Sequence, residues 1–243
     1  MSRRWIRLIL LAVSLAGATG TMAGESLHLP DSRWSGFYFG AHIAHHDIKT
    51  SGLFDGTGEP AGPFWLDRIG DQGMHGGIHA GYSKQWQRFV LGLEADFAPG
   101  GFARSGLTVQ DGTATEAGLL SYPLRGELDY LATARVRAGI TASSDVLFYA
   151  TAGAAFTRFE MDIANGRSRV GFNATGLAFG GGAEIALSHN ISVRAEWLRL
   201  NFDKGLRFTD VATSGIFDAN DGDHLRLSHI DLARVALTIK IGP

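Results

Sequence analysis

Charged side chains recur at alternate positions within several apolar stretches of this sequence. FVLGLEADF, at residues 89–97, carries Glu94 and Asp96, and ARVRAG, at residues 134–139, carries Arg135 and Arg137. Because successive side chains of a β-strand point to opposite faces, each charged pair would share one face and the apolar residues the other. Two nearby carboxylates can act as general acid and base, whereas carboxylates beside arginines can form buried ion pairs. The choice depends on what that face meets.

The same alternation places nine charged residues on the polar faces of candidate strands. They are four acids and five bases: Glu94, Asp96, Glu184, Glu196, Arg135, Arg137, Arg194, Arg234 and Lys240. Arginine dominates the bases, and its planar guanidinium suits bidentate pairing with carboxylates in an enclosed space. Mutual pairing accounts for this near-balanced set better than a hydrolytic carboxylate pair does. We therefore predict a charge network in the interior of the fold.

Four histidines form a second polar set. His42 and His46 alternate on one segment, and His75 and His79 alternate on the next. We expect a hairpin in which His42 lies opposite His79 and His46 opposite His75. Four imidazoles on one ladder face could bind Zn²⁺ or Cu²⁺. Neutral imidazole also tolerates partial burial without a metal, so we favour polar layers hydrogen-bonded to carboxylates or water, with no metal and no cofactor.

Alternation with a period of two predicts eight strands that would position these side chains. They lie near residues 36–46, 74–85, 89–98, 127–141, 146–159, 174–187, 191–202 and 228–241. Three connections are tight turns around QWQR, ASSD and SHN, and the other four are long, at 47–73, 99–126, 160–173 and 203–227. Outer-membrane barrels show this strict alternation, with short periplasmic turns and longer extracellular loops.

The two faces of these strands indicate which solvent each one meets. In the segment at residues 89–98, Phe89, Leu91 and Leu93 share an apolar face. The corresponding face of each of the eight segments carries almost no charge. In a soluble β-protein the charged face would meet water, whereas in a membrane barrel it lines the lumen. We predict an all-β fold, an eight-stranded antiparallel up-and-down transmembrane β-barrel over residues 36–243. Aromatic residues near strand ends would form interfacial girdles: Trp34, Phe37, Tyr82, Trp86, Phe89, Phe97, Tyr130 and Phe148.

The N-terminal residues predict export. Arg3, Arg4 and Arg7 precede an apolar run, and small residues flank a cleavage position after Ala23, so residues 1–23 have the pattern of a signal peptide. Residues 24–35 would then form a short periplasmic segment. Cleavage removes three arginines and no acid, which moves the formal charge from −2 to −5. The chain has no cysteine and no basic stripe, so we expect neither disulfides nor a nucleic-acid partner.

Several stretches together resemble a known family. RWSGFYFGAHIA, GIHAGYSKQW, FVLGLEADF, LATARVRAGI, LFYATAGAAF, GGGAEIAL and ISVRAEWLRL are similar to the small porin-family surface proteins of Gram-negative outer membranes, especially the eight-stranded alphaproteobacterial branch. The resemblance implies a cell outer-membrane location and recognition by the barrel assembly machinery. Such barrels usually end on an aromatic residue, whereas this chain ends Lys240-Ile241-Gly242-Pro243. Either Ile241 substitutes as the last outward apolar residue, or assembly is less efficient.

These patterns support a structural, surface-exposed barrel without enzyme activity, in contact with outer-membrane lipids and lipopolysaccharide. No nucleophile elbow, zincin helix or phosphate-binding loop appears in the sequence. A narrow porin for small solutes is the main alternative. A lipocalin-like soluble binder fits poorly with a charged interior, and a lipid-modifying barrel enzyme lacks a recognisable nucleophile and base in the sequence.

Overall fold

The computed structural model describes residues 33–54, 64–110, 121–163, 168–202, 205–207 and 224–241. The expected signal peptide at 1–23 and most of the expected periplasmic segment at 24–35 lie outside these residues. The central parts of the four long connections also lie outside them. No helix in the described part of the chain is a candidate for a membrane span.

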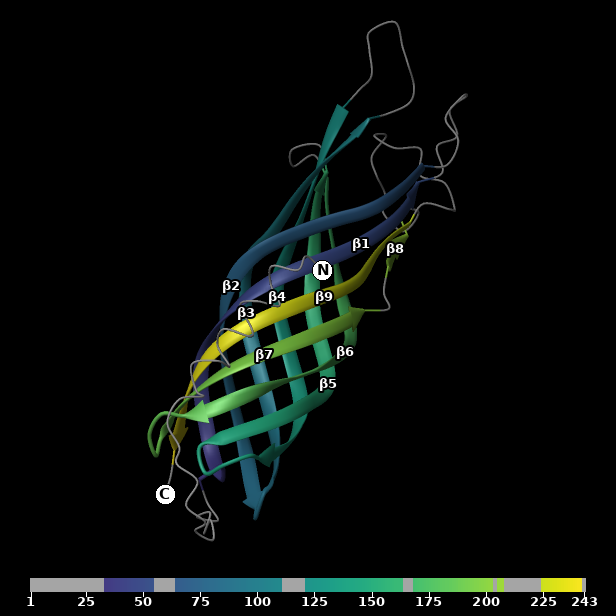
Figure 1. Cartoon of the computed structure of the whole chain (residues 1–243). Coiled ribbons are helices and arrows are strands. Elements are labelled where there is room, and N and C mark those ends of the chain that lie inside the picture. The colour runs from purple at the N-terminus through teal and green to yellow at the C-terminus, as the bar shows by residue number, and fades with distance from the viewer. Residues whose placement is uncertain are drawn as a thin grey trace, which may run out of the picture.

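The described chain forms strands that wind around one barrel (Figure 1). Their bounds are β1 Gly36–Phe54, β2 Phe64–Trp86, β3 Phe89–Gln110, β4 Ser121–Thr141, β5 Val146–Ile163, β6 Ser168–Ala186, β7 Ile191–Phe202, β8 Gly205–Arg207 and β9 His224–Ile241. Each strand pairs antiparallel with its neighbours, and β1 pairs with β9 to close the sheet. β7 and the short β8 both pair with the same edge of β9, one after the other, so together they count as one of the eight strands of the barrel. The prediction of a closed eight-strand antiparallel barrel is confirmed.

The connections differ at the two ends of the barrel. Residues 87–88, 142–145 and 187–190 join consecutive strands tightly, as predicted, and we call this the turn end. Gln87 has a φ of 54°, the left-handed conformation that a two-residue hairpin turn requires. At the opposite end, the hairpin end, the strands run further than expected: β1 reaches Phe54 and β2 begins at Phe64, inside the region predicted as a loop.

The predicted long loops are therefore partly strands. The β3–β4 hairpin rises beyond the others at the hairpin end (Figure 1). Sequence alternation detected only the part of each strand with one apolar face, because that part has the pattern of a wall between lipid and lumen. Beyond it the ladder continues on backbone hydrogen bonds, which do not depend on an apolar face.

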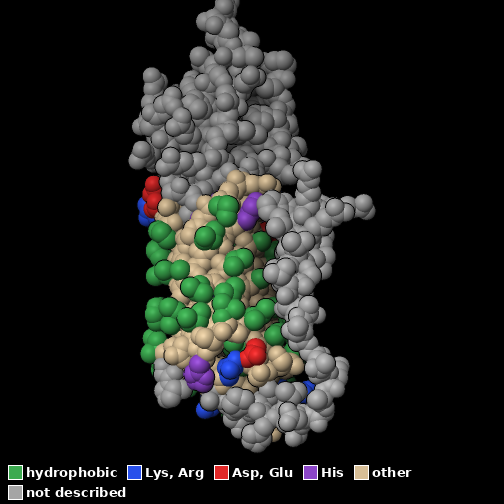
Figure 2. Space-filling view, turned by 60° about the vertical axis from the view of Figure 1, so that its left-hand side comes forward, with side chains coloured by type: hydrophobic (Ala, Val, Ile, Leu, Met, Phe, Trp, Pro, Cys, Tyr) green, Lys and Arg blue, Asp and Glu red, His purple; other side chains and the backbone are tan. Residues whose placement is uncertain are grey.

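Side chains alternate between an apolar outer face and a polar inner face. Large apolar residues are exposed along the wall: Phe37, Phe39, Ile43, Ile78, Tyr82, Phe89, Leu91, Leu93, Val136, Phe148, Leu177, Val235, Leu237 and Ile241. Figure 2 shows hydrophobic side chains spread over one side of the wall, with charged side chains near its upper and lower margins. Glu94 and Asp96 are buried, so the charged face of β3 points into the lumen. Among the described residues, Ile241 is the last outward apolar one.

Candidate functional site

Six charged side chains meet in the middle of the lumen, and we call them the central cluster: Glu94 and Asp96 from β3, Arg135 from β4, Arg194 and Glu196 from β7, and Arg234 from β9. Arg135 is the hub. Its Nη2 lies 2.6 Å from Glu94 Oε1 and 2.8 Å from Asp96 Oδ2, and its Nη1 lies 3.2 Å from Glu196 Oε1. The register makes the first contact direct, since Glu94 and Arg135 are cross-strand partners.

Two further arginines complete the central cluster from the opposite wall. Arg194 forms two hydrogen bonds with Glu94, and Arg234 donates from Nε to Glu196. Arg234 Nη1 also lies 3.4 Å from Asp96 Oδ2. The three acids and three arginines so linked are buried together, so each charge depends on its partners for compensation.

Neutral hydroxyl groups add hydrogen bonds to carboxylate oxygens that arginines of the central cluster already contact. Tyr38 donates to Glu94 Oε2 at 2.9 Å, and Thr133 donates to Asp96 Oδ2 at 2.5 Å. Thr133 lies on β4, next to β3, whereas Tyr38 reaches Glu94 from β1, so β1 also contributes to the network. These hydroxyls could not be selected from the sequence, because alternation places many uncharged polar residues on the same inner faces.

A second ion pair lies nearer the turn end. Arg137 donates to Glu184 Oε2, and Ser192 donates to Glu184 Oε1 at 2.5 Å. The Arg137 guanidinium also stacks on the Tyr149 ring, with its carbon 3.6 Å from the ring centroid. Eight of the nine charges selected from the sequence thus lie in these two groups. Lys240 is half-buried at the turn end, where its ammonium donates to the carbonyl oxygen of Arg33 at 2.7 Å.

The four histidines share the lumen face of β1 and β2, but their pairing differs from the expected one. The register places His42 opposite Gly77, His46 opposite Gly73, and His79 opposite Gly40. The expected pairing of histidine with histidine is wrong by two residues, which is the smallest slip that keeps every side chain on its own face. A slip of two leaves the apolar pattern unchanged, so the sequence pattern could not detect it.

The histidine rings form a column along the lumen and fill space above glycines. A Cβ added to Gly77 would lie 2.6 Å from His42 Nε2, and one added to Gly40 would lie 2.5 Å from His79 Cε1. Along the column, His46 Nδ1 lies 3.1 Å from His75 Nδ1, and His79 Nε2 lies 3.0 Å from Thr238 Oγ1. Within the described residues, no group of three or more potential ligands is arranged to hold a metal ion.

Trp34 lies inside the barrel at the turn end. The sequence analysis placed it in an interfacial girdle, which is wrong: the side chain is only 7 % exposed and packs with Val90, Leu147 and Tyr149. The backbone at Gly36, two residues further on, explains why the Trp34 side chain points into the lumen. Gly36 has a φ of 121°, which residues with a side chain rarely adopt, and this bend turns the preceding residues back across the lumen.

Hydrogen bonds hold this segment across the turn end. The Trp34 amide donates to Gln85 Oε1 at 3.1 Å, and Ser83 donates to the Trp34 carbonyl at 2.5 Å. Arg33 forms an ion pair with Asp145 in one of the tight turns. We call residues Arg33–Ser35 the turn-end seal, because they lie across the lumen below the two charged groups. The sequence analysis missed it, since the bend at one glycine decides on which side of the wall the tryptophan falls.

A serine, a histidine and an aspartate also lie near one another on β9. Ser228 Oγ is 3.3 Å from His229 Nδ1, and His229 Nε2 is 3.9 Å from Asp231 Oδ2. The second distance is too long for a hydrogen bond. Both oxygens of Asp231 instead accept from Arg199, at 2.7 and 2.8 Å. The aspartate therefore does not orient the imidazole, and the group falls short of a nucleophile–base–acid arrangement.

A family model described as an outer membrane protein beta-barrel domain matches residues 8–222. The chain belongs to this family. Two similar proteins are the 31 kDa outer-membrane immunogenic proteins of Brucella melitensis and Brucella suis. Each is 24 % identical to this chain over 253 residues, which cover 96 % of this chain and 98 % of the relative. This family member is accordingly an outer-membrane protein of the Gram-negative type.

Solved barrels resemble this outer-membrane protein in fold. Neisserial surface protein A is 15 % identical, with 85 % of this chain and 98 % of that chain covered and a TM-score of 0.47. OprG from Pseudomonas aeruginosa is 14 % identical, with 86 % and 98 % covered and a TM-score of 0.48.

Proposed function

We propose that this outer-membrane barrel has a structural and surface role and that its lumen is plugged, so that it conducts few ions. The observation that carries the proposal is the contact of Arg194 and Arg135 with Glu94. Arg194 reaches Glu94 from the opposite wall, while Arg135 joins the same carboxylate to Glu196. An eight-stranded barrel is only wide enough for side chains to fill, and these charges occupy that space.

The turn-end seal supports the same proposal, because it blocks the lumen at a second height, nearer the turn end than the central cluster. Trp34 and its partners close the lumen with apolar surface, whereas the central cluster closes it with compensated charge. A hydrated ion would have to displace both. We infer no catalytic activity, because the carboxylates of the lumen are engaged with arginines and hydroxyls and the Ser228 group lacks an orienting acid.

The surface role follows from the two ends of the barrel. Short turns face the periplasm in outer-membrane barrels and longer connections face outward, so we assign the turn end to the periplasm and the hairpin end to the exterior. The relatives in Brucella are described as immunogenic, which agrees with an exposed hairpin end. Outer-membrane lipids and lipopolysaccharide would surround the wall, and the barrel assembly machinery would insert it.

Single-channel recording in planar bilayers tests the plugged lumen. The unmodified protein should show at most small, rare openings, and Arg135→Ala combined with Arg137→Ala should make them larger and more frequent. Arg88→Ala, in an exposed turn, is the matched control and should leave the record unchanged. Heat-modifiable gel mobility shows that each protein is folded. Large, stable steps from the unmodified protein would contradict the proposal and favour the narrow porin.

A further inference from the structure

The wall of the barrel is interrupted near the hairpin end, between β7 and β9. The β7–β9 ladder runs as far as the pair Asn201 and His229, and the β8–β9 ladder begins at Gly205 and Arg226. Ser228 falls between these two registers. It is also skipped on the other side of β9, where Lys49 pairs with His229 and Thr50 with Leu227. The backbone of β9 bulges here, as strands do where side chains are redirected.

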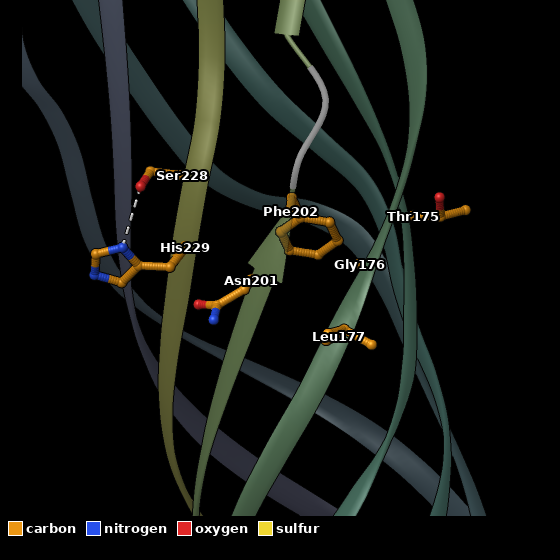
Figure 3. Close-up of a pocket in the computed structure, with 7 residues that line it drawn as sticks. All are labelled: Thr175, Gly176, Leu177, Asn201, Phe202, Ser228 and His229. Atoms are coloured by element: carbon orange, nitrogen blue, oxygen red, sulfur yellow. Dashed lines mark hydrogen bonds between the residues drawn. The ribbon is translucent and has the colours of Figure 1, made fainter.

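A pocket of about 740 Å³ occupies this interruption (Figure 3). Its lining residues come from β6, β7 and β9: Thr175, Gly176, Leu177, Asn201, Phe202, Ser228 and His229. Thr175, Leu177 and Asn201 are exposed on the outer face, whereas Phe202 is buried. The pocket is therefore accessible from outside the wall and is backed by an aromatic ring. Its volume lies in the range of about 300–1,000 Å³ typical of small-molecule sites.

The pocket lies where the outer wall changes from apolar to polar. In the registers, Leu177, Asn201 and His229 form one row across three strands. The outward residues of the next row toward the turn end include the Arg199–Asp231 pair, and the row after that contains Trp197 and Ala233. From there to the turn end the wall is apolar. This level corresponds to the headgroup region of a membrane leaflet.

The lining chemistry points to one kind of occupant. Hydroxyl, amide and imidazole groups of Thr175, Ser228, Asn201 and His229 can both donate and accept hydrogen bonds. Leu177 and Phe202 supply apolar surface beside them, and none of the described lining residues carries a carboxylate or an ammonium group. Sugar rings need this combination of neutral hydrogen bonding and apolar contact. The apolar wall below would receive acyl chains, so the occupant is amphiphilic.

We infer that this pocket binds the sugar headgroup of an outer-leaflet glycolipid, whose acyl chains lie along the outer faces of β6 and β7. The inference rests on the lipid contact and the orientation proposed above and gives that contact a defined site. Lys49, opposite His229 in the register, places a cation at one side of the pocket for a headgroup phosphate. The Arg199–Asp231 pair, fixed by two hydrogen bonds, forms a rigid lower border.

Native mass spectrometry of the full-length protein in detergent, titrated with purified lipid A, tests the site. We expect saturable retention of one lipid A molecule. Thr175→Leu combined with Asn201→Leu should lower the affinity by about tenfold, because the headgroup loses two hydrogen bonds while the apolar surface remains. Gln72→Leu is the matched control: this exposed amide lies on the outer face of β2, away from the pocket, and its loss should change nothing.

Two comparisons separate a site from general lipid adhesion. Phosphatidylglycerol has acyl chains but no sugar rings. The unmodified protein should retain it more weakly than lipid A, and all three proteins should retain it to the same extent. Equal retention of lipid A by all three proteins, or equal retention of both lipids by the unmodified protein, would overturn the inference. Neither result bears on the plugged lumen, because the substitutions leave the central cluster intact and conductance is recorded separately.

Discussion

The central cluster and the histidine column fill the same lumen but are held in different ways. The central cluster joins β3, β4, β7 and β9, and each of its carboxylates contacts arginines from more than one strand. The histidine column remains on β1 and β2, where three of its rings lie over glycines of the neighbouring strand. The first is a network of compensated charge, and the second is mainly a packing arrangement.

Polar residues of the lumen therefore have two different structural roles. Removing one charge from the central cluster leaves its buried partners with less compensation, whereas a histidine over a glycine chiefly supplies volume. The number of polar residues on the inner face therefore does not measure how much each contributes to stability. The three substitutions below test this distinction, from the largest expected effect to the smallest.

Arg194→Met removes one guanidinium from the central cluster and leaves Glu94 with fewer compensating charges. The expected loss of unfolding free energy is about 3–5 kcal/mol, the usual cost of breaking a buried ion pair by removing one partner. Urea titration of the protein folded into lipid vesicles measures it. Lys240→Met, at the half-buried turn end, should cost clearly less, and equal losses for the two variants would show that the central cluster is not the more strongly coupled group.

Gly77→Ala tests the packing of the histidine column. The added methyl group would meet His42 Nε2 at 2.6 Å and the Phe97 carbonyl oxygen at 2.8 Å, so we expect a loss of about 1–3 kcal/mol from overpacking. Gly76→Ala is the adjacent control, because its nearest atom would be the His42 carbonyl oxygen at 3.7 Å. The same urea titration compares them. Equal stability of the two variants would place the His42 ring away from Gly77.

His42→Leu replaces a ring with an apolar side chain of comparable reach. His42 Nδ1 has no hydrogen-bond partner in the described structure, so we expect the unfolding free energy to fall by less than about 1.5 kcal/mol. Thermal or urea unfolding in vesicles provides the measurement. A loss as large as that of Arg194→Met would mean that the column belongs to the charge network and would remove the distinction drawn above.

Much of the barrel could be predicted from its sequence, because a wall between lipid and lumen imposes a period of two. The eight segments, the three tight turns and the inward face of Glu94, Arg135 and Arg194 all follow from that period. The arginine-rich composition of the inner face indicated ion pairing, and the structure contains such pairs. It could not indicate which arginine meets which carboxylate, since partners such as Arg194 and Glu94 lie on strands far apart in the chain.

The features that escaped prediction do not change the alternation. A slip of two residues between β1 and β2 keeps every side chain on its face while moving His42 from His79 to Gly77. The extension of β1 to Phe54 lengthens the ladder beyond the segment that alternation detected. Trp34 precedes the first strand, and the bend at Gly36 decides whether its ring meets lipid or lumen. Each depends on geometry that a pattern of apolar and polar letters does not record.

The bridge from Arg194 to Glu94 also bears on how the barrel is inserted. Glu94 lies on β3 and Arg194 on β7, so any partial sheet that lacks β7 holds this carboxylate without one of its arginines. Exposure of such a partly compensated charge to hydrocarbon is costly. A partial sheet should therefore remain outside the bilayer core or shielded by other protein surface until β7 and β9 arrive. Closure of the wall and neutralisation of the interior would then occur in a single late step of assembly.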